Sequence, residues 1–192
     1  KEALYRENGC EFRFNVDTCY FSPRLSSERK EIANQIRRGE DVLVLFGGVA
    51  PFAIVIAKTG KSGRVVSVEL GRQCSKYALE NVKRNKLIGK VEIVQGDARR
   101  VLPRMKEKFD RIVMARPNLK DSFLDAVWNR IKKKGMIYYY GFYEEDKVSN
   151  LRELIEKKAK EAKKEIKILR IKKAGDIGIR KYRYRADLII NN

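Results

Sequence analysis

The stretch from Asp41 to Gly60, DVLVLFGGVAPFAIVIAKTG, decides the fold. Its first part, VLVLF, is a nearly continuous apolar run, which is typical of a strand buried on both faces of a parallel sheet. Two glycines follow where this strand ends, and a second apolar segment begins at Pro51. A strand, a glycine-containing loop and a helix in this order predict the first unit of an α/β fold, with the helix start facing the loop.

The rest of the chain repeats this alternation. Short apolar runs at 64–70, 91–95, 109–115 and 135–142 are separated by longer amphipathic runs. The pattern predicts a parallel sheet with helices on both faces. Two more runs follow, EIKILRIKKAG and KYRYRADLII. They are joined by AGDIG at 174–178 with no helix between them, which predicts an antiparallel hairpin at one edge. Five parallel strands followed by a hairpin is the Rossmann-like sheet of class I methyltransferases, whereas a dinucleotide-binding fold would continue with further crossover units.

A short β/α extension precedes the sheet. We expect it to span residues 1–38, with the methyltransferase domain at 39–192. CEFRFNVDTCYFS predicts two short strands with a turn at residues 15–18. SSERKEIANQIRR predicts a helix that one of the serines at 26–27 caps and that Gly39 ends.

Composition predicts a soluble globular protein with a polyanionic partner. The chain has 192 residues, 43% of them hydrophobic and 36% charged, which excludes a disordered chain. Its apolar runs are shorter than the roughly 18 residues that a membrane span needs. The net charge is +19, and 15 basic but 5 acidic residues lie between Lys147 and Arg185. Such an uneven basic field is typical of RNA or DNA binding, although a Lys- and Glu-rich thermophile surface gives a similar composition.

The sequence has no histidine and three cysteines, Cys10, Cys19 and Cys74. Without histidine the usual zinc sites and the Ser/His/Asp and Cys/His catalytic groups cannot form, so an acid or base must be a carboxylate, Lys, Tyr or Cys. The cysteines fit neither a metal spacing nor a paired framework. We therefore expect unpaired thiols in a reducing compartment, and a cytoplasmic monomer with no structural metal and no membrane contact.

Loops after three successive strands predict a cofactor site. Glycines in the loop at 46–51 let a ligand approach the backbone, and Pro51 removes an N–H donor that a pyrophosphate would use. Glu69 ends the second strand, where an acid hydrogen-bonds ribose hydroxyls in such folds or caps a helix. Asp97 follows the third strand and either accepts from an adenine amino group or caps a helix. The expected cofactor-binding residues are Phe46, Gly47, Gly48, Val49, Ala50, Pro51, Glu69, Leu70, Asp97, Ala98, Ala115 and Pro117.

Six segments together resemble the archaeal and eukaryotic tRNA methyltransferases that modify N1 of guanosine 37, just 3′ of the anticodon. They are YRENGCEFRFNVDTCYFSPRLSSER at 5–29, VLVLFGGVAPFAIVIAK at 42–58, VVSVEL at 65–70, LENVKRNKL at 79–87, VEIVQGDAR at 91–99 and DRIVMARP at 110–117. The resemblance implies S-adenosyl-L-methionine as the cofactor and tRNA as the partner. It also implies a small N-terminal domain, ahead of Lys1, that binds the tRNA elbow.

The same resemblance maps a catalytic Glu-Arg pair and a preceding site tyrosine onto Glu28, Arg29 and Tyr20. Methyl transfer to guanine N1 needs a base for the N1 proton and a cation or donor for charge that builds on O6. A carboxylate beside an arginine supplies both. The alternative is structural, with Glu28 in the first turn of a helix and Arg29 solvated.

One position departs from the family pattern. The family has asparagine in an Asn-x-Pro motif after the fourth strand, whereas this chain has Ala115, Arg116 and Pro117. Either Arg116 or Asn118 takes over the contact, or the substrate differs, or activity is lost. Two alternatives therefore stay open, which are an aminocarboxypropyl transferase of wyosine synthesis and a non-catalytic tRNA-binding relative.

Basic and polar residues near the predicted site and along the C-terminal hairpin are the expected RNA contacts, because phosphates are held by Lys and Arg. They are Arg6, Arg24, Arg116, Asn118, Lys120, Lys172, Lys173, Arg180, Lys181, Arg183 and Arg185.

Overall fold

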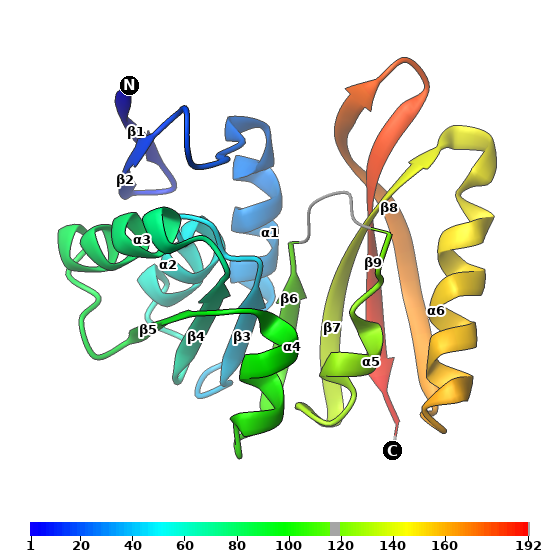
Figure 1. Ribbon diagram of the computed structural model, residues 1–192. Coiled ribbons are helices and arrows are strands. Elements are labelled where there is room, and N and C mark those ends of the chain that lie inside the picture. The colour runs from blue at the N-terminus through cyan, green and yellow to red at the C-terminus, as the bar shows by residue number, and fades with distance from the viewer. Residues whose placement is uncertain (116–119, 192) are drawn as a thin grey trace.

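Seven strands form one sheet in the computed structural model, which describes residues 1–115 and 120–191 (Figure 1). The strands are β3 (Val42–Leu45), β4 (Val65–Glu69), β5 (Val91–Gln95), β6 (Phe109–Met114), β7 (Ile131–Glu144), β8 (Ile166–Gly178) and β9 (Lys181–Ile190). Their order is β5-β4-β3-β6-β7-β9-β8. The first five strands pair in parallel, and β9 runs antiparallel to both β7 and β8. The predicted parallel sheet with an antiparallel edge hairpin is confirmed.

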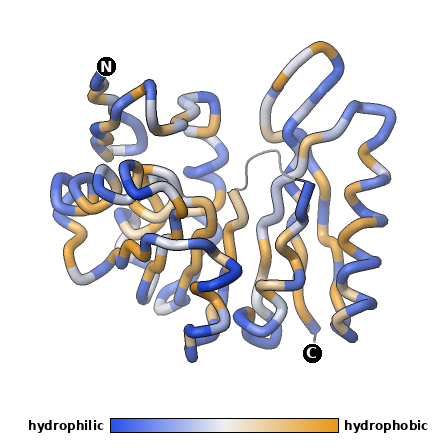
Figure 2. The backbone as a smooth tube through the Cα atoms, in the orientation of Figure 1, coloured by the Kyte–Doolittle hydropathy of each residue, from blue (hydrophilic) through white to orange (hydrophobic). Residues whose placement is uncertain are grey.

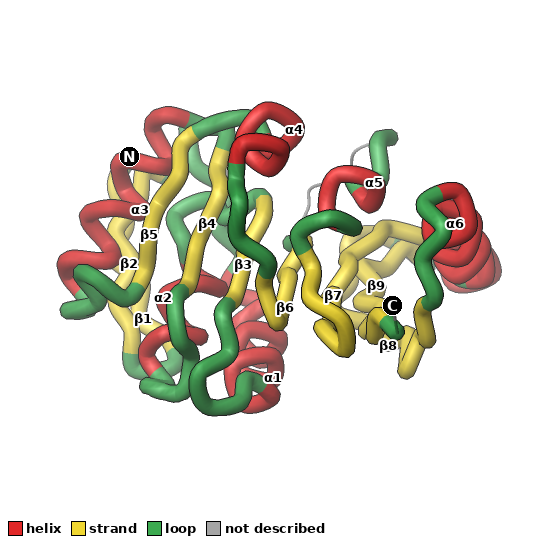
Figure 3. Tube along the Cα trace, turned by 90° about the horizontal axis from the view of Figure 1, so that it is seen from below, coloured by secondary structure: helices red, strands yellow, loops and turns green. Residues whose placement is uncertain are grey.

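Helices cover both faces of this sheet (Figures 1 and 3). One face carries α1 (Ser26–Gln35), α2 (Pro51–Lys58) and α3 (Arg72–Arg84), whose buried side chains share one apolar cluster. The other face carries α4 (Ala98–Val101), α5 (Leu124–Val127) and α6 (Ser149–Glu161), which belong to a second cluster. Single turns of 3-10 helix complete the list, namely η1 (Pro23–Leu25), η2 (Leu102–Arg104) and η3 (Glu145–Lys147).

The hydropathy of each element matches its place (Figure 2). All four residues of β3 are fully buried, as expected for a central strand with helices on both sides. α2 is apolar around most of its circumference, because it packs against the sheet, α1 and the N-terminal hairpin. α3 and α6 have one apolar and one charged face, which is the pattern of helices at the surface.

The N-terminal hairpin consists of β1 (Glu2–Glu7) and β2 (Cys10–Asn15). Its turn is Asn8-Gly9, and both residues have positive φ angles, which is the usual chemistry of a two-residue hairpin turn. The predicted turn at residues 15–18 is therefore wrong as a hairpin turn, because the chain there bends after the second strand and leads to η1. α1 also differs from expectation, since it begins at Ser26 without a side-chain cap and ends at Gln35, before Gly39.

Two asparagines of α3 attach this hairpin to the domain. Asn81 accepts from the Arg13 N–H at 2.7 Å and donates to the Arg13 carbonyl at 3.1 Å. Asn85 repeats both bonds with the backbone of Glu11, at 2.9 and 2.7 Å. The side-chain amides thus satisfy the outer backbone edge of β2, which would otherwise be an unpaired strand edge.

Cys19 and Cys74 form a disulfide with Cα atoms 5.5 Å apart, so the prediction of unpaired thiols is wrong for these two residues. Their separation of 55 residues gives no sequence signal, because the pairing depends on how the segment after β2 crosses the start of α3. Cys10 is a buried free thiol, and burial raises its pKa to about 11. Within the described residues no helix is both long and apolar enough to cross a membrane.

Candidate active site

A cavity of 890 Å³ lies at the carboxyl ends of β3, β4 and β5 and extends toward the β8–β9 hairpin. Carboxyl ends of parallel strands are where open α/β sheets bind ligands. The cavity is lined by seven expected cofactor residues, Phe46, Gly48, Glu69, Leu70, Asp97, Ala98 and Ala115, and by Tyr20, Lys120 and Arg183 from the other expected sets. The structure thus brings two groups of residues to one cavity. The cofactor half consists of the seven expected cofactor residues, and the other half is formed by the N-terminal segment and the C-terminal hairpin.

Glu69 connects two loops of the cofactor half. Its Oε2 accepts from the Gly48 N–H at 2.8 Å, and its Oε1 accepts from the Gly71 N–H at 2.7 Å. The carboxylate therefore fixes the glycine loop after β3 against the start of α3. Gly48 has a φ of 56°, so this position favours glycine in the loop itself.

Four of the expected cofactor residues lie behind the cavity wall. Gly47 packs on β4, where a Cβ would collide with the Ser67 hydroxyl. Val49 and Ala50 are fully buried beneath the loop, and Pro51 is the first residue of α2. These four residues shape the loop and the start of the helix and do not line the cavity. Of the two glycines, Gly48 faces the cavity and Gly47 faces β4.

Asp97 both caps α4 and lines the cavity. Its Oδ1 accepts from the Arg99 N–H at 2.9 Å. Two aromatic rings stand nearby, since Phe46 and Phe123 meet edge to face with centroids 5.0 Å apart. The Arg99 guanidinium lies 4.8 Å from the Phe123 centroid and is bound by two aspartates, so it fixes this side of the cavity.

Tyr20 also lines the cavity, with 74% of its surface exposed. Its hydroxyl accepts from Arg183 at 3.2 Å, and the Arg183 guanidinium lies 5.2 Å from the Phe142 centroid. Burial raises the pKa of Tyr20, but hydrogen bonds with Arg183 and Ser22 outweigh it and lower the pKa overall. Arg183 is thus held in place by two aromatic residues that also line the cavity.

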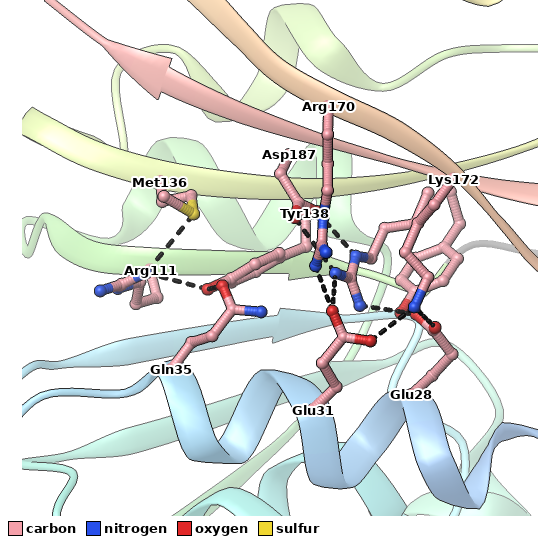
Figure 4. A network of polar contacts seen from close by, with 11 residues as sticks. Glu28, Glu31, Gln35, Arg111, Met136, Tyr138, Arg170, Lys172 and Asp187 are labelled. Atoms are coloured by element: carbon pink, nitrogen blue, oxygen red, sulfur yellow. Dashed lines mark hydrogen bonds and ion pairs between the residues drawn. The ribbon is translucent and has the colours of Figure 1, made fainter.

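Glu28 is buried and does not line the cavity. Its Oε1 binds Lys172 at 2.7 Å (Figure 4). Its Oε2 accepts from Tyr140 at 2.9 Å and from Arg185 at 2.7 Å. Tyr140 does line the cavity. Burial, followed by the charge of Glu28, raises the pKa of Tyr140 well above its usual value.

Arg29 faces away from Glu28, as adjacent residues of a helix do. It forms a buried ion pair with Glu7 and donates to the Ser22 carbonyl at 2.9 Å. Its guanidinium also lies 5.0 Å from the Phe21 centroid. The expected pair of base and cation at 28–29 is therefore not brought together, because the two side chains point in different directions. Glu28 does lie in the first turn of α1, as the structural alternative has it, but Arg29 is buried and not solvated.

Arg185 is fully buried, which corrects its expected role as an RNA contact. It bridges Glu28, Glu31 and Asp187, each at 2.7 Å. Lys172 shares this network, since its ammonium pairs with both Glu28 and Glu31 (Figure 4). Burial raises the pKa of Glu31, but the hydrogen bonds from Lys172 and Arg185 lower it overall to about 2.

The other expected RNA residues are placed as follows. Arg180 and Lys181 are exposed at the hairpin tip, while Lys173 of β8 pairs with Glu145 of η3. Arg24 is exposed on η1, and Arg6 pairs with Glu11 on the N-terminal hairpin. Arg116, Pro117 and Asn118 lie outside the described residues.

Sequence reasoning missed much of the cavity wall. The missed residues are Leu25, Phe52, Val68, Cys74, Gly96, Asp121, Phe123, Tyr140, Phe142 and Ile177. Most are apolar and follow ordinary strand and helix patterns. The one usable signal is the run YYYGF at the end of β7, since polar or aromatic residues at a strand's carboxyl end in this fold face the ligand edge.

Comparison with known proteins places the chain in a family. The model of the TRM5/TYW2 methyltransferase domain matches residues 3–169. Trm5b of Pyrococcus abyssi, a tRNA (guanine(37)-N(1))-methyltransferase, is 38% identical over 141 residues, which are 73% of this chain and 41% of that protein. Taw22 of Nanoarchaeum equitans, a tRNA (guanine(37)-N(1))/4-demethylwyosine(37)-methyltransferase, is 30% identical over 98% of this chain and 79% of its own length.

Solved structures agree with the sequence matches. The crystal structure of Pyrococcus abyssi Trm5b superposes with a TM-score of 0.90 at 32% identity, covering 100% of this chain and 56% of that one. Trm5 of Methanocaldococcus jannaschii in complex with adenosine gives a TM-score of 0.84 at 26% identity, covering 100% and 56%. The chain thus spans about half the length of these relatives. It belongs to the TRM5/TYW2 methyltransferase family.

Proposed function

We propose that this chain is the catalytic part of an S-adenosylmethionine-dependent tRNA methyltransferase that acts on N1 of guanosine 37. The observation that carries the proposal is a single cavity that is lined both by Glu69 and Asp97 and by Tyr20, Tyr140 and Arg183. The two carboxylates suit a nucleoside, and the tyrosines beside Arg183 suit a flat base next to a cation. The family and the names of the relatives support the same reaction.

The cofactor half fits a nucleoside with few charges. Glu69 offers carboxylate oxygens to ribose hydroxyls, and Asp97 lies where an adenine amino group can donate to it. Phe46 and Phe123 supply aromatic surface for the adenine ring. When bound, S-adenosylmethionine supplies an electrophilic methyl group on its sulfonium.

For the reaction on the substrate base, we assign the proton acceptor to Glu28 and the cation beside O6 to Arg183. Glu28 is a carboxylate held next to the cavity through Tyr140. Arg183 replaces Arg29 in this assignment because it lines the cavity, whereas Arg29 is paired with Glu7 behind it. The Arg183 guanidinium also lies 5.2 Å from the centroid of Phe142, another residue of the cavity wall.

Ala115 supports a second candidate, methylation of 4-demethylwyosine at position 37. It lines the cavity with an apolar side chain where the family pattern has an amide. Taw22 of Nanoarchaeum equitans carries both activities in its name.

Transfer of radiolabelled methyl from S-adenosylmethionine to tRNA transcripts tests the proposal. We expect transfer to guanosine 37 and none to a transcript with adenosine there. Transfer only to tRNA that carries 4-demethylwyosine would support the second candidate. Transfer of an aminocarboxypropyl group, detected with carboxyl-labelled cofactor, would contradict both, and tRNA binding without any transfer would indicate a non-catalytic relative.

A further inference from the structure

The carboxylate assigned as the base is separated from the cavity by one side chain. Glu28 does not line the cavity, but its Oε2 accepts a hydrogen bond from the Tyr140 hydroxyl at 2.9 Å. Tyr140 lies on β7 and belongs to the cavity wall. A substrate base in the cavity therefore meets Tyr140 before it can meet Glu28.

We propose that Tyr140 is a catalytic residue that passes the N1 proton of the substrate base to Glu28. As N1 attacks the methyl carbon, the N1–H proton moves to the Tyr140 Oη, and the Tyr140 hydroxyl proton moves to the Glu28 carboxylate. The N1–C bond forms while the C–S bond breaks, and the bonding pair stays on sulfur. Tyr140 ends as it began, and Glu28 becomes a neutral acid. This inference rests on the proposed function.

The other partners of Glu28 cannot carry this proton. Arg185 contacts the same Oε2 at 2.7 Å, but a guanidinium has no acceptor site and does not deprotonate in proteins. Lys172 contacts Oε1 and is already a cation bound to two carboxylates. Tyr140 alone among these three partners lines the cavity and both donates and accepts.

Arg185 acts as a positioning residue in this arrangement. It is fully buried between Glu28, Glu31 and Asp187, so it fixes the carboxylate that receives the hydroxyl proton. The raised pKa of Tyr140 has the same consequence, because the resting side chain keeps the proton that Glu28 accepts.

Tyr140→Phe tests the relay, and Tyr138→Phe is its matched control. Tyr138 lies two positions earlier on the same strand face and is also fully buried, but its hydroxyl bonds with Gln35 and Arg111 and it does not line the cavity. In single-turnover methyl transfer at saturating tRNA and S-adenosylmethionine, we expect Tyr140→Phe to be slower by on the order of 10²-fold and Tyr138→Phe to keep the wild-type rate.

Raising the pH separates a relay from a structural role. Above the pKa of guanine N1 the base needs no acceptor, so the defects of Tyr140→Phe and Glu28→Gln should shrink together as the pH rises. A structural defect would persist at every pH. The cofactor affinity of Tyr140→Phe, measured by calorimetry, should equal that of the wild type, which checks that the cavity is intact.

Three outcomes overturn the relay. They are a wild-type rate in Tyr140→Phe, a defect that high pH does not reduce, and an equal loss in Tyr138→Phe. Each of these requires an active wild-type enzyme. If the wild type itself transfers no methyl group to guanosine 37, the proposed function fails instead, and the two failures are thereby distinguished.

Discussion

Glu69 fixes two loops and, in the proposed function, also accepts from the cofactor ribose. Its two oxygens accept from Gly48 and Gly71, so it fixes the backbone on both sides of the cofactor half. We expect Glu69→Ala to weaken S-adenosylmethionine binding by roughly 1 to 3 kcal/mol, because the ribose acceptor and both backbone anchors are lost. Calorimetry measures this change. Glu92→Ala, an exposed glutamate of β5, should leave the affinity unchanged, and tight binding of NAD instead of S-adenosylmethionine would contradict the cofactor assignment.

Arg29 illustrates the opposite case, a motif residue whose contacts are structural. It is 1% exposed and pairs with Glu7, which is also buried. Removal of one partner of a buried ion pair leaves an unpaired charge, so Arg29→Ala should lower the free energy of unfolding by about 3 to 5 kcal/mol. Urea unfolding measures the loss. Lys30→Ala, a change at the adjacent exposed residue, is the control. An Arg29→Ala variant that keeps full stability but loses methyl transfer would indicate that Arg29 acts on the substrate.

At the level of elements, α3 contributes to both the hairpin and the cofactor loop. Asn81 bonds with the backbone of Arg13 and also donates to the Val49 carbonyl at 3.2 Å. We expect Asn81→Ala to lower stability by roughly 1 to 3 kcal/mol, since buried backbone groups lose their partners. Hydrogen exchange should show the Arg13 amide opening faster. Lys83→Ala on the exposed side of α3 is the control, and unchanged exchange at Arg13 would mean that apolar packing alone holds the hairpin.

Strand pattern and loop position could be predicted because they depend on local sequence. VLVL identifies β3, and the alternation of runs gives the sheet and its edge hairpin. The Asn8-Gly9 turn is also a local signal, because this dipeptide favours the two positive φ angles that a two-residue hairpin turn requires.

Contacts between distant segments could not be predicted in the same way. The Cys19–Cys74 pair and the Asn81 bonds to β2 join segments separated by more than 50 residues. The different directions of Glu28 and Arg29 depend on which helix face meets β7 and which meets the hairpin. Charge, finally, does not tell a buried Arg185 from an exposed Arg180 when both lie in one basic strand pair.

Across the whole molecule, positive charge lies at both ends of the strands of the sheet. The segments at the strand ends opposite the cavity are 36–41, 59–64, 85–90, 105–108, 128–134, which includes the first four residues of β7, and 162–165. They hold 14 basic and 4 acidic residues, which is more than half of the net charge of +19. The C-terminal hairpin is therefore one of two basic regions, and charge alone does not identify the tRNA surface.

A pair of double variants tests which end of the strands binds tRNA. Arg180→Gln with Lys181→Gln neutralises the exposed hairpin tip beside the cavity. Lys133→Gln with Lys134→Gln removes the same charge at the opposite end of the strands. We expect only the hairpin variant to flatten the slope of log tRNA affinity against log salt, by roughly 1 to 2, because fewer counterions are released. Filter binding at several salt concentrations measures the slope. An effect of the Lys133 and Lys134 variant alone would place the tRNA at the strand ends away from the cavity.

The Cys19–Cys74 bond closes a covalent ring around the first β-α-β unit of the sheet. The ring contains α1, β3, α2 and β4, and with them Glu28, the glycine loop and Glu69. A protease cut anywhere between the two cysteines therefore leaves both fragments joined until a reductant is added. In the chain-entropy view, closing a ring of this size stabilises the fold by about 4 kcal/mol. The segment that carries the proposed base and the segment that carries the proposed ribose acceptor therefore lie within one covalently closed loop.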